Sequence, residues 1–574
     1  MKKTISYLMT NTKLKMKEVV MKNKILAVAF LASILAVNAQ NPLPKDSFVV
    51  IKSYKPTISE GNRLGFNPTI IDSQKVIQSL DYRFISNQVP VTFDVEPIGA
   101  AKIKGEPLTK LYNGYARLGV GNNTIPLAEL YYHNSRSKSF SLGTHLRYQQ
   151  NNDIKDYDNS SMSNLRAVVF GKKFWRANTL SGTVGYEREG FNYYGFEVDD
   201  INRSIADTTD TKQVYHNLFA QLQMKSTKQD SFNLRHEFGL DYYRIADLDG
   251  LIAENNIVAN GSVGKFYNNE YYHVDATFDF NNGANTLDTI NNILFGLRPQ
   301  VNSIGEKFRL NIGMGIYMDA INTAKFHFYP IVDFKYNALR DIIVPYAGFT
   351  GRMERNNMRS LTRTNQFLSS DIQLLNTNYK YEAYAGIRGV VSSKLSFNTS
   401  IRKFKIDDFA MFVKEPSGLN NKFVLVYDDI EQLQFTGEMQ YQMGEKWRVF
   451  LRGDYFGYNA GAEEEVWHMP NYKITLSGVY DLNDKIIVRM DLHQIGEQFA
   501  KTYENISGGT IIADAITKET LSGVFDANLG VEYRYTKRLS AFINFNNIGS
   551  ASYERWQDYP TQRFNILGGL TYSF

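Results

Sequence analysis

The sequence predicts an all-β fold, a transmembrane antiparallel β-barrel of about 22 strands preceded by a short irregular segment. Three observations predict it. Apolar and polar side chains alternate along the chain, short and long connections alternate between the strands, and the chain ends on an amphipathic strand. Composition agrees, because aromatic residues make up 14% of a chain whose mean hydropathy is −0.34 and whose charged fraction is 21%. This is too hydrophilic for a bundle of membrane helices, but it is typical of a barrel with aromatic girdles and a wet interior.

The first 39 residues have the pattern of a presequence that contains a signal peptide. A basic stretch, Met21–Lys24, precedes the apolar run Ile25–Ala36, and small residues follow at Val37–Ala39. The apolar run is too short to span a bilayer as a stable helix, and a buried N-terminal helix is the alternative interpretation. We expect translation to start at Met21 and cleavage to follow Ala39.

Charge and cysteine content exclude several classes of protein. The formal net charge is +5, but residues 1–39 contribute seven Lys or Arg and one Glu, so the mature chain carries −1. Nothing in that charge indicates a nucleic-acid partner. The chain has no cysteine, which excludes a disulfide framework, a thiolate metal site and a lipidated N-terminal cysteine. Any membrane anchoring must therefore come from the fold.

Residues 40–109 form a separate N-terminal region, which we expect to be irregular and periplasmic. Seven of the fourteen prolines lie here, and proline forbids long helices and central strands. Within it, Asp46–Val50 loosely resembles the energy-coupling segment of TonB-dependent transporters. An edge strand without a coupling role is the interpretation that we prefer.

From residue 110 to the C-terminus, apolar and polar side chains alternate with the two-residue period of β-strands. Residues 525–535 show this most clearly, and residues 140–149 and 486–493 repeat it. In the first of these stretches the apolar face holds Phe525, Ala527, Leu529, Val531, Tyr533 and Tyr535. A soluble β-sandwich would alternate in the same way, so this periodicity does not by itself distinguish a barrel from a sandwich.

The connections make that distinction. Short turns are expected at residues 135–138, 176–178, 392–394, 444–446, 483–485 and 536–538. Longer polar segments lie between them, at residues 151–161, 192–212, 356–378, 407–429, 459–470, 500–520 and 547–561. Strict alternation of this kind places all short turns at one rim and all long loops at the other, as in outer-membrane barrels. Counting by this rule gives about 22 strands, and an even number places both ends of the barrel in the periplasm.

The last strand, residues 564–574, is the predicted closing strand of the barrel. Its apolar face is expected to contact lipid or a neighbouring strand, since a terminal Phe would otherwise be frayed and exposed. The residues assigned to closure and assembly are Phe564, Ile566, Leu570, Tyr572 and Phe574.

The segment before that strand resembles the C-terminal pattern of TonB-dependent receptors. The matching residues are Asn547, Ile548, Tyr553, Trp556, Tyr559, Pro560 and Arg563, followed by the final Phe574. The resemblance implies a Gram-negative outer membrane, of the Bacteroidetes type, and recognition by the barrel assembly machinery. It departs from that family in one respect, because residues 40–109 are too short and irregular for the usual plug domain. Energy-coupled import is therefore not implied.

No motif for catalysis, a cofactor or a metal ion is present, so we expect a protein that is not an enzyme. Asp247–Gly250 resembles the start of a calcium loop but lacks the other ligands, and a tight turn explains it. Glu463–Glu465, with Trp467 and His468, is interpreted as a solvated loop, with a cation or ligand site as the alternative. Paired tyrosines are interpreted as membrane girdles, with sugar stacking as the alternative; they are Tyr131-Tyr132, Tyr193-Tyr194, Tyr242-Tyr243 and Tyr271-Tyr272.

These features predict a receptor-like barrel in the outer membrane that transports or binds a solute. Its long loops are expected to be extracellular. The alternative is a structural or accessory subunit of an envelope complex; a barrel enzyme is the third and least supported class. Expected partners are outer-membrane lipids, lipopolysaccharide, the assembly machinery and other envelope proteins. Since a bore of this size is usually filled, either residues 40–109 or the loops at residues 356–378, 407–429 and 500–520 should occupy it.

Overall fold

The structure is a computed structural model that describes residues 112–574 except 135–136, 156, 197–210, 228–233, 249, 285–288, 322, 340–341, 417–419, 504–505, 508–509 and 512–515. Contacts divide the chain into Met1–Ile103 and Lys104–Phe574, and all described residues belong to the second unit. The expected signal peptide and the N-terminal region of residues 40–109, with the Asp46–Val50 segment, lie outside the described residues.

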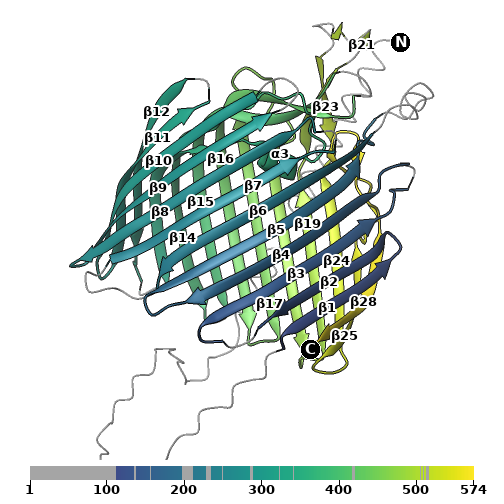
Figure 1. Cartoon of the computed structure of the whole chain (residues 1–574), viewed down its shortest axis with the longest axis horizontal. Coiled ribbons are helices and arrows are strands. Elements are labelled where there is room, and N and C mark those ends of the chain that lie inside the picture. Colours follow the sequence, from purple (N-terminus) through teal and green to yellow (C-terminus); the bar gives the residue numbers. More distant parts are fainter. Residues whose placement is uncertain are drawn as a thin grey trace, which may run out of the picture. The chain divides into compact units, whose positions relative to one another are not determined.

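Among the described residues, 22 strands form one closed antiparallel sheet, which confirms the predicted fold class and strand number (Figure 1). The strands are β1 (Gly114–Gly121), β2 (Thr124–His133), β3 (Phe140–Asn151), β4 (Met162–Phe174), β5 (Asn178–Asn192), β6 (Lys212–Ser226), β7 (Leu234–Ala246), β8 (Ala253–Tyr267), β9 (Glu270–Ala284), β10 (Thr289–Ile304), β11 (Phe308–Ala320), β12 (Ala324–Tyr336), β13 (Ile343–Glu354), β14 (Thr377–Ser392), β15 (Leu395–Lys414), β16 (Phe423–Met443), β17 (Trp447–Asn459), β18 (Tyr472–Leu482), β19 (Ile486–Ile495), β24 (Val524–Arg534), β25 (Leu539–Asn546) and β28 (Asn565–Ser573).

The barrel closes between its first and last strands. The register places Tyr115 of β1 opposite Ser573 of β28. Beyond that pair, the carbonyl oxygen of Phe574 accepts hydrogen bonds from the backbone amides of Asn113 and Gly114, each at 2.9 Å. Glycine at position 114 leaves room for the Phe574 ring, which a Cβ atom there would overlap. The last strand therefore closes the barrel, as predicted, by pairing with β1 on one side and β25 on the other.

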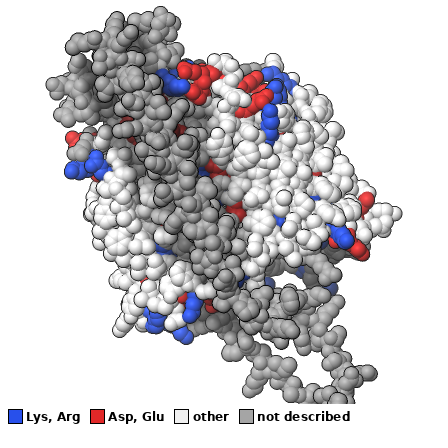
Figure 2. Space-filling view, turned by 180° about the vertical axis from the view of Figure 1, so that it is seen from behind, with Lys and Arg blue, Asp and Glu red and all other residues white. Residues whose placement is uncertain are grey.

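The two faces of the wall differ as the alternation predicted. Phe525 and Tyr533 of β24 are exposed on the outside, whereas Asp526 and Glu532 point inward and bind other lumenal side chains. The residues assigned to closure lie on the outer face, and Phe564, Leu570, Tyr572 and Phe574 are exposed there. Figure 2 shows an outer wall largely free of Lys, Arg, Asp and Glu, which gather toward its ends. A membrane-spanning barrel requires such an apolar belt.

The connections separate into a turn rim, which holds the ends of the barrel, and a loop rim opposite. The longer connections all lie at the loop rim, as predicted. Strict alternation was nevertheless wrong, because some loop-rim connections are also short: only two residues separate β1 from β2, and three separate β11 from β12. The loop rim therefore carries long loops on some parts of its circumference and short turns on others.

The predicted polar loop at residues 407–429 is mostly strand. β15 continues to Lys414 and β16 begins at Phe423, and the two pair beyond an irregularity between Ile406 and Phe409. The prediction was wrong because polar side chains were taken to end a strand. Where a hairpin extends beyond the membrane, its outer face contacts water instead of lipid. That face therefore does not have to be apolar.

Smaller elements complete the loop rim. They are the hairpins β20 (Gln498–Tyr503) with β23 (Ile516–Leu521), β21 (Ile506–Ser507) with β22 (Thr510–Ile511), and β26 (Glu554–Trp556) with β27 (Tyr559–Pro560), and the helix α3 (Met358–Thr364). Within the described part of the chain, no helix has the length and apolar character needed to cross a bilayer.

Candidate functional site

The connection between β13 and β14 folds into the mouth of the barrel at the loop rim, and we call residues 355–376 the infolded segment (Figure 1). It contains α3, which begins where Asn357 caps the backbone amide of Ser360 and the Ser360 side chain bonds back to Asn357. Met358 and Leu361 of this helix are buried against the inner wall. Of the two alternatives for filling the bore, infolded loops are therefore observed at residues 356–378, while residues 40–109 lie outside the described residues.

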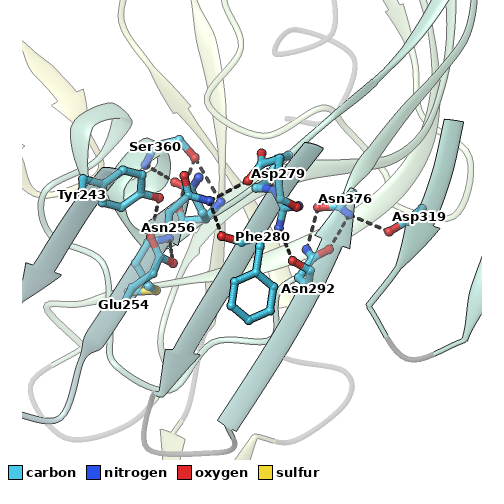
Figure 3. A network of polar contacts seen from close by, with 12 residues as sticks. Tyr243, Glu254, Asn256, Asp279, Phe280, Asn292, Asp319, Ser360 and Asn376 are labelled. Carbon is cyan, nitrogen blue, oxygen red and sulfur yellow. Dashed lines mark hydrogen bonds and ion pairs between the residues drawn. The ribbon is translucent and has the colours of Figure 1, made fainter. Parts of the chain in front are cut away.

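A buried carboxylate fixes the start of the helix. Glu254 of β8 has no solvent exposure, and one of its oxygens accepts a hydrogen bond from the backbone amide of Met358 at 2.8 Å. Its other oxygen accepts the Tyr243 hydroxyl at 2.7 Å (Figure 3). Since a buried carboxylate is costly without partners, these bonds hold Glu254 and the helix together.

An arginine fixes the entrance to the infolded segment. Arg355 is almost fully buried, with a side-chain exposure of 5%. Its Nε donates to an Asp279 carboxylate oxygen at 2.7 Å, and its Nη atoms donate to the backbone oxygens of Asp279 and Asn292 at 2.7 and 3.1 Å. This charge-assisted set of bonds ties the segment to the inner faces of β9 and β10.

The other end of the segment is held by amides. Asn376 donates to the Asp319 carboxylate at 2.7 Å and exchanges hydrogen bonds with Asn292 across a buried contact (Figure 3). Asn292 therefore touches both ends of the infolded segment, since its backbone oxygen binds Arg355. The segment is anchored twice on adjacent strands of one wall.

Aromatic packing joins the infolded segment to two other loops. The ring of Phe367 stacks on that of Tyr559, with centroids 3.6 Å apart and planes 21° apart. Tyr193 donates its hydroxyl to the backbone oxygen of Leu368 at 2.9 Å, and Tyr194 donates to that of Pro560 at 3.1 Å. These residues belong to one buried cluster in the mouth of the barrel.

The family-like motif residues of the C-terminal loop lie in this mouth. Asn547 has a left-handed backbone with φ of 47°, and its side-chain amide donates to two carbonyl oxygens of the same loop. Tyr553 donates to the inner-wall residue Asp526 at 2.8 Å, while Trp556 packs on Phe412. Tyr559 and Pro560 are buried, whereas Ile548 and Arg563 are exposed. An assembly role for these residues stays a prediction.

Two sequence interpretations at the mouth were wrong. Tyr193 and Tyr194 are buried inside the mouth rather than placed in a membrane girdle, and burial raises the pKa of Tyr193 to about 12. Trp467 and His468 are buried rather than solvated. Rings that meet lipid headgroups and rings that pack inside a wide barrel produce the same sequence pattern near strand ends.

His468 sits at a tightly packed position. Its Nδ1 lies 2.9 Å from the backbone oxygen of Phe412, and the backbone amide of Gln557 donates to its Nε2 at 3.4 Å. Burial lowers the pKa of His468 to about 4, and the nearby Lys414 ammonium acts in the same direction. The imidazole is therefore neutral at pH 7 and joins the C-terminal loop to β15.

A buried lysine adds a second contact between the same elements. The Lys414 side chain has an exposure of 3%, pairs with Asp558 of the C-terminal loop and donates to the backbone oxygen of Gly195 at 3.2 Å. The Asp558 side chain is 41% exposed, so the pair is only half buried and solvent screens it in part. Lys414 thus connects three loop-rim segments at one point.

The inner wall is polar, and its charges are largely paired. Arg489 and Glu532 form an ion pair at 3.1 Å, and Arg452 bridges Glu438 and Asp454. Among the described residues, no group of three or more His, Asp or Glu side chains is arranged to hold a metal ion. The described inner wall is therefore polar, and its mouth at the loop rim is packed.

No protein-family model matches the sequence, and no curated protein matches it either. Solved structures do match the fold. The pyoverdine outer membrane receptor FpvA from Pseudomonas aeruginosa PAO1 is 13% identical, over 81% of this chain and 79% of its own, with a TM-score of 0.60. The siderophore receptor PirA from Acinetobacter baumannii is 11% identical over 82% and 81%, with a TM-score of 0.62. The ferric-catecholate import receptor Fiu from E. coli K12 is 10% identical over 81% and 82%, with a TM-score of 0.57.

The class of protein follows from these matches and the closed wall. The chain has the fold of the barrels of outer-membrane siderophore receptors, and the predicted resemblance to such barrels is confirmed at the level of the fold. An apolar wall closed by backbone pairing satisfies the bilayer's requirement that no strand edge remain free.

The residues that sequence reasoning missed are the anchors of the infolded segment. Glu254, Arg355 and Asn376 each lie at or next to a strand end, where charged and amide side chains usually face water. Their only local signal was the capping pattern at Asn357 and Ser360, which marks a short helix inside a loop.

Proposed function

We propose that this protein is an outer-membrane barrel that binds or passes a small solute, with the infolded segment controlling access at the extracellular mouth. The observation that carries the proposal is the polar bore whose mouth is occupied by one loop anchored at both ends. Long loops of outer-membrane barrels face the exterior, so the loop rim is assigned to the outside and the turn rim to the periplasm.

The likeness to siderophore receptors supports a receptor or transport role in general. It does not identify the solute, and the described residues contain no candidate metal cluster in the wall. Closure of the bore by residues 40–109, which are too short and irregular for the usual plug domain, is a separate proposal. Under it, those residues close the periplasmic side while the infolded segment closes the mouth.

Movement of the infolded segment is the step that would open the mouth. Besides its polar anchors, the segment is held by buried apolar side chains, among them Leu361 and Leu368, and by the stacked pair of Phe367 and Tyr559. Opening would exchange these buried contacts for contacts with a ligand. The barrel wall itself needs no change for the mouth to open.

The experiment is conductance in planar bilayers. The parent barrel for this test lacks residues 42–105, so that closure of the periplasmic side cannot mask the result. We expect it to show small, intermittent openings, and a variant in which residues 358–374 are also replaced by a Gly-Ser linker to show a large steady conductance. A matched control shortens the hairpin β21–β22 of another loop instead and should behave as the parent barrel does. A linker variant that conducts no better than the parent barrel would contradict the proposed role of the segment.

The alternative is a non-transporting subunit of an outer-membrane complex. The extent of the buried aromatic cluster favours it, since a mouth packed this way resembles a permanent core. Reproducible co-purification of other envelope proteins, with no solute-dependent conductance, would support this alternative.

A further inference from the structure

A cavity of about 460 Å³ lies in the mouth beside the infolded segment, between the C-terminal loop and the inner faces of β18, β19 and β24. Most of its lining is aromatic or aliphatic, and Trp556, Tyr553 and Phe412 supply rings. A volume of this size and an apolar lining with a few polar groups are typical of small-molecule sites.

Two cations lie in this lining without partners. Lys473 of β18 and Arg555 of the C-terminal loop are both exposed, and among the described residues neither side chain makes a hydrogen bond or an ion pair. Both side chains line the same cavity. The nearby Asp454 does not neutralise Lys473, because it is bound by Arg452, Thr436 and Gln434.

The two acidic side chains of the lining each accept a hydrogen bond. Asp526 accepts the Tyr553 hydroxyl at 2.8 Å with one oxygen while its other oxygen is buried, and Glu554 accepts the backbone amide of Asp558 at 2.8 Å. Burial raises the pKa of the Glu554 carboxyl. Among the described charged side chains of the lining, Lys473 and Arg555 are therefore the ones without a hydrogen bond or an ion pair.

A ring lies beside these donors. Trp556 contacts Phe412 and His468, with centroids 5.2 Å away in each case, and it follows Arg555 directly in the chain. The same pair of residues, with Thr364 of the infolded segment, also lines a neighbouring cavity of about 290 Å³. An occupant of the larger cavity would thus touch the segment that closes the mouth.

We propose that this cavity binds a small organic anion with an aromatic or flat apolar body, its anionic group held by Arg555 and Lys473 and its body by Trp556. The inference rests on the proposed function, since it assigns a class of solute to the same mouth. A guanidinium and an ammonium both favour carboxylate and phosphate oxygens, and a flat ring packs favourably against tryptophan.

The test is equilibrium dialysis with the full-length mature chain in lipid nanodiscs, with empty nanodiscs as the blank. The probes are two aromatic anions, indole-3-acetate and phenyl phosphate, with the neutral indole-3-acetamide and the cationic tryptamine for comparison. We expect at least one anion to bind at least tenfold more tightly than the neutral and cationic compounds. In the double variant Arg555→Gln with Lys473→Gln, the Kd of that anion should rise at least tenfold.

Arg298→Gln is the matched control, because Arg298 is an exposed cation on another part of the inner wall. Its binding should equal that of the native protein, and heat-modifiable migration checks that every variant is folded. Equal binding of acid and amide, an unaffected double variant, or no binding of either anion would overturn the proposal. A native barrel that binds the anion but shows no conductance would remove the transport function and leave this site standing.

Discussion

The ring of Phe367 in the infolded segment lies flat on the ring of Tyr559 in the C-terminal loop, 192 residues further along the chain, with centroids 3.6 Å apart. Both rings are buried, and Tyr559 donates its hydroxyl to the backbone of Asn421. The pair joins two loops that the sequence presents as independent connections, so each loop holds the other in the mouth.

Removing one ring should free the infolded segment. Phe367→Ala leaves a cavity against Tyr559, and truncating a buried phenylalanine typically costs about 3–5 kcal/mol. We expect a larger and steadier conductance in planar bilayers. Phe326→Ala, which truncates a ring exposed on the outer wall, should leave the conductance unchanged. Equal traces for both variants would show that the stacked pair does not hold the mouth closed.

The contribution of the polar anchor Arg355 to docking of the infolded segment can be measured separately from that of the stacked rings. Arg355→Met leaves Asp279 without its buried partner, which costs roughly 3–5 kcal/mol of docking free energy. The segment would then leave the wall, so trypsin should cut after Arg359 or Arg363 in the folded barrel. Lys225→Met is the control, since it removes only an exposed pair with Glu237, worth less than about 1 kcal/mol. Resistance of the Arg355→Met segment to trypsin would mean that packing alone docks it.

Acid should loosen the C-terminal loop through His468. Its pKa is about 4 when docked and near 6.5 when free, so the free state binds more protons between these values. Docking therefore weakens as the pH falls from 6.5 toward 4, by at most about 3 kcal/mol. His468→Asn should remove this part of the pH dependence. Thermal unfolding of the two proteins between pH 7 and 4.5 measures it, and parallel curves would assign the acid sensitivity to other groups.

Phe574→Asp should block insertion without blocking secretion. The ring lies on the outer face at the closing seam, where a charge costs on the order of 1–4 kcal/mol depending on depth. Membrane fractionation and heat-modifiable migration report the outcome. Phe574→Tyr keeps an aromatic ring and should insert normally. Normal insertion of the aspartate variant would count against recognition of this terminus.

The wall could be predicted because its physical constraint repeats along the chain. Lipid on one side and water on the other force every strand to alternate, as in Phe525 with Asp526 and Leu529 with Asn528. The mouth has no such repeat. Tyr193, Phe367 and Tyr559 come from three distant loops and meet only in space, so no local pattern marks their contact. The Lys473 and Arg555 cavity escaped prediction for the same reason.

The pairing of β1 with β28, beside Gly114, determines when the barrel can close during biogenesis. The amide and carbonyl groups of β1 that pair with β28 have no permanent partner until β28 (Asn565–Ser573) has been synthesised. The first strand is thus made some 450 residues before the strand that completes it. During all of that interval the β1 edge is open and has to be kept from pairing elsewhere.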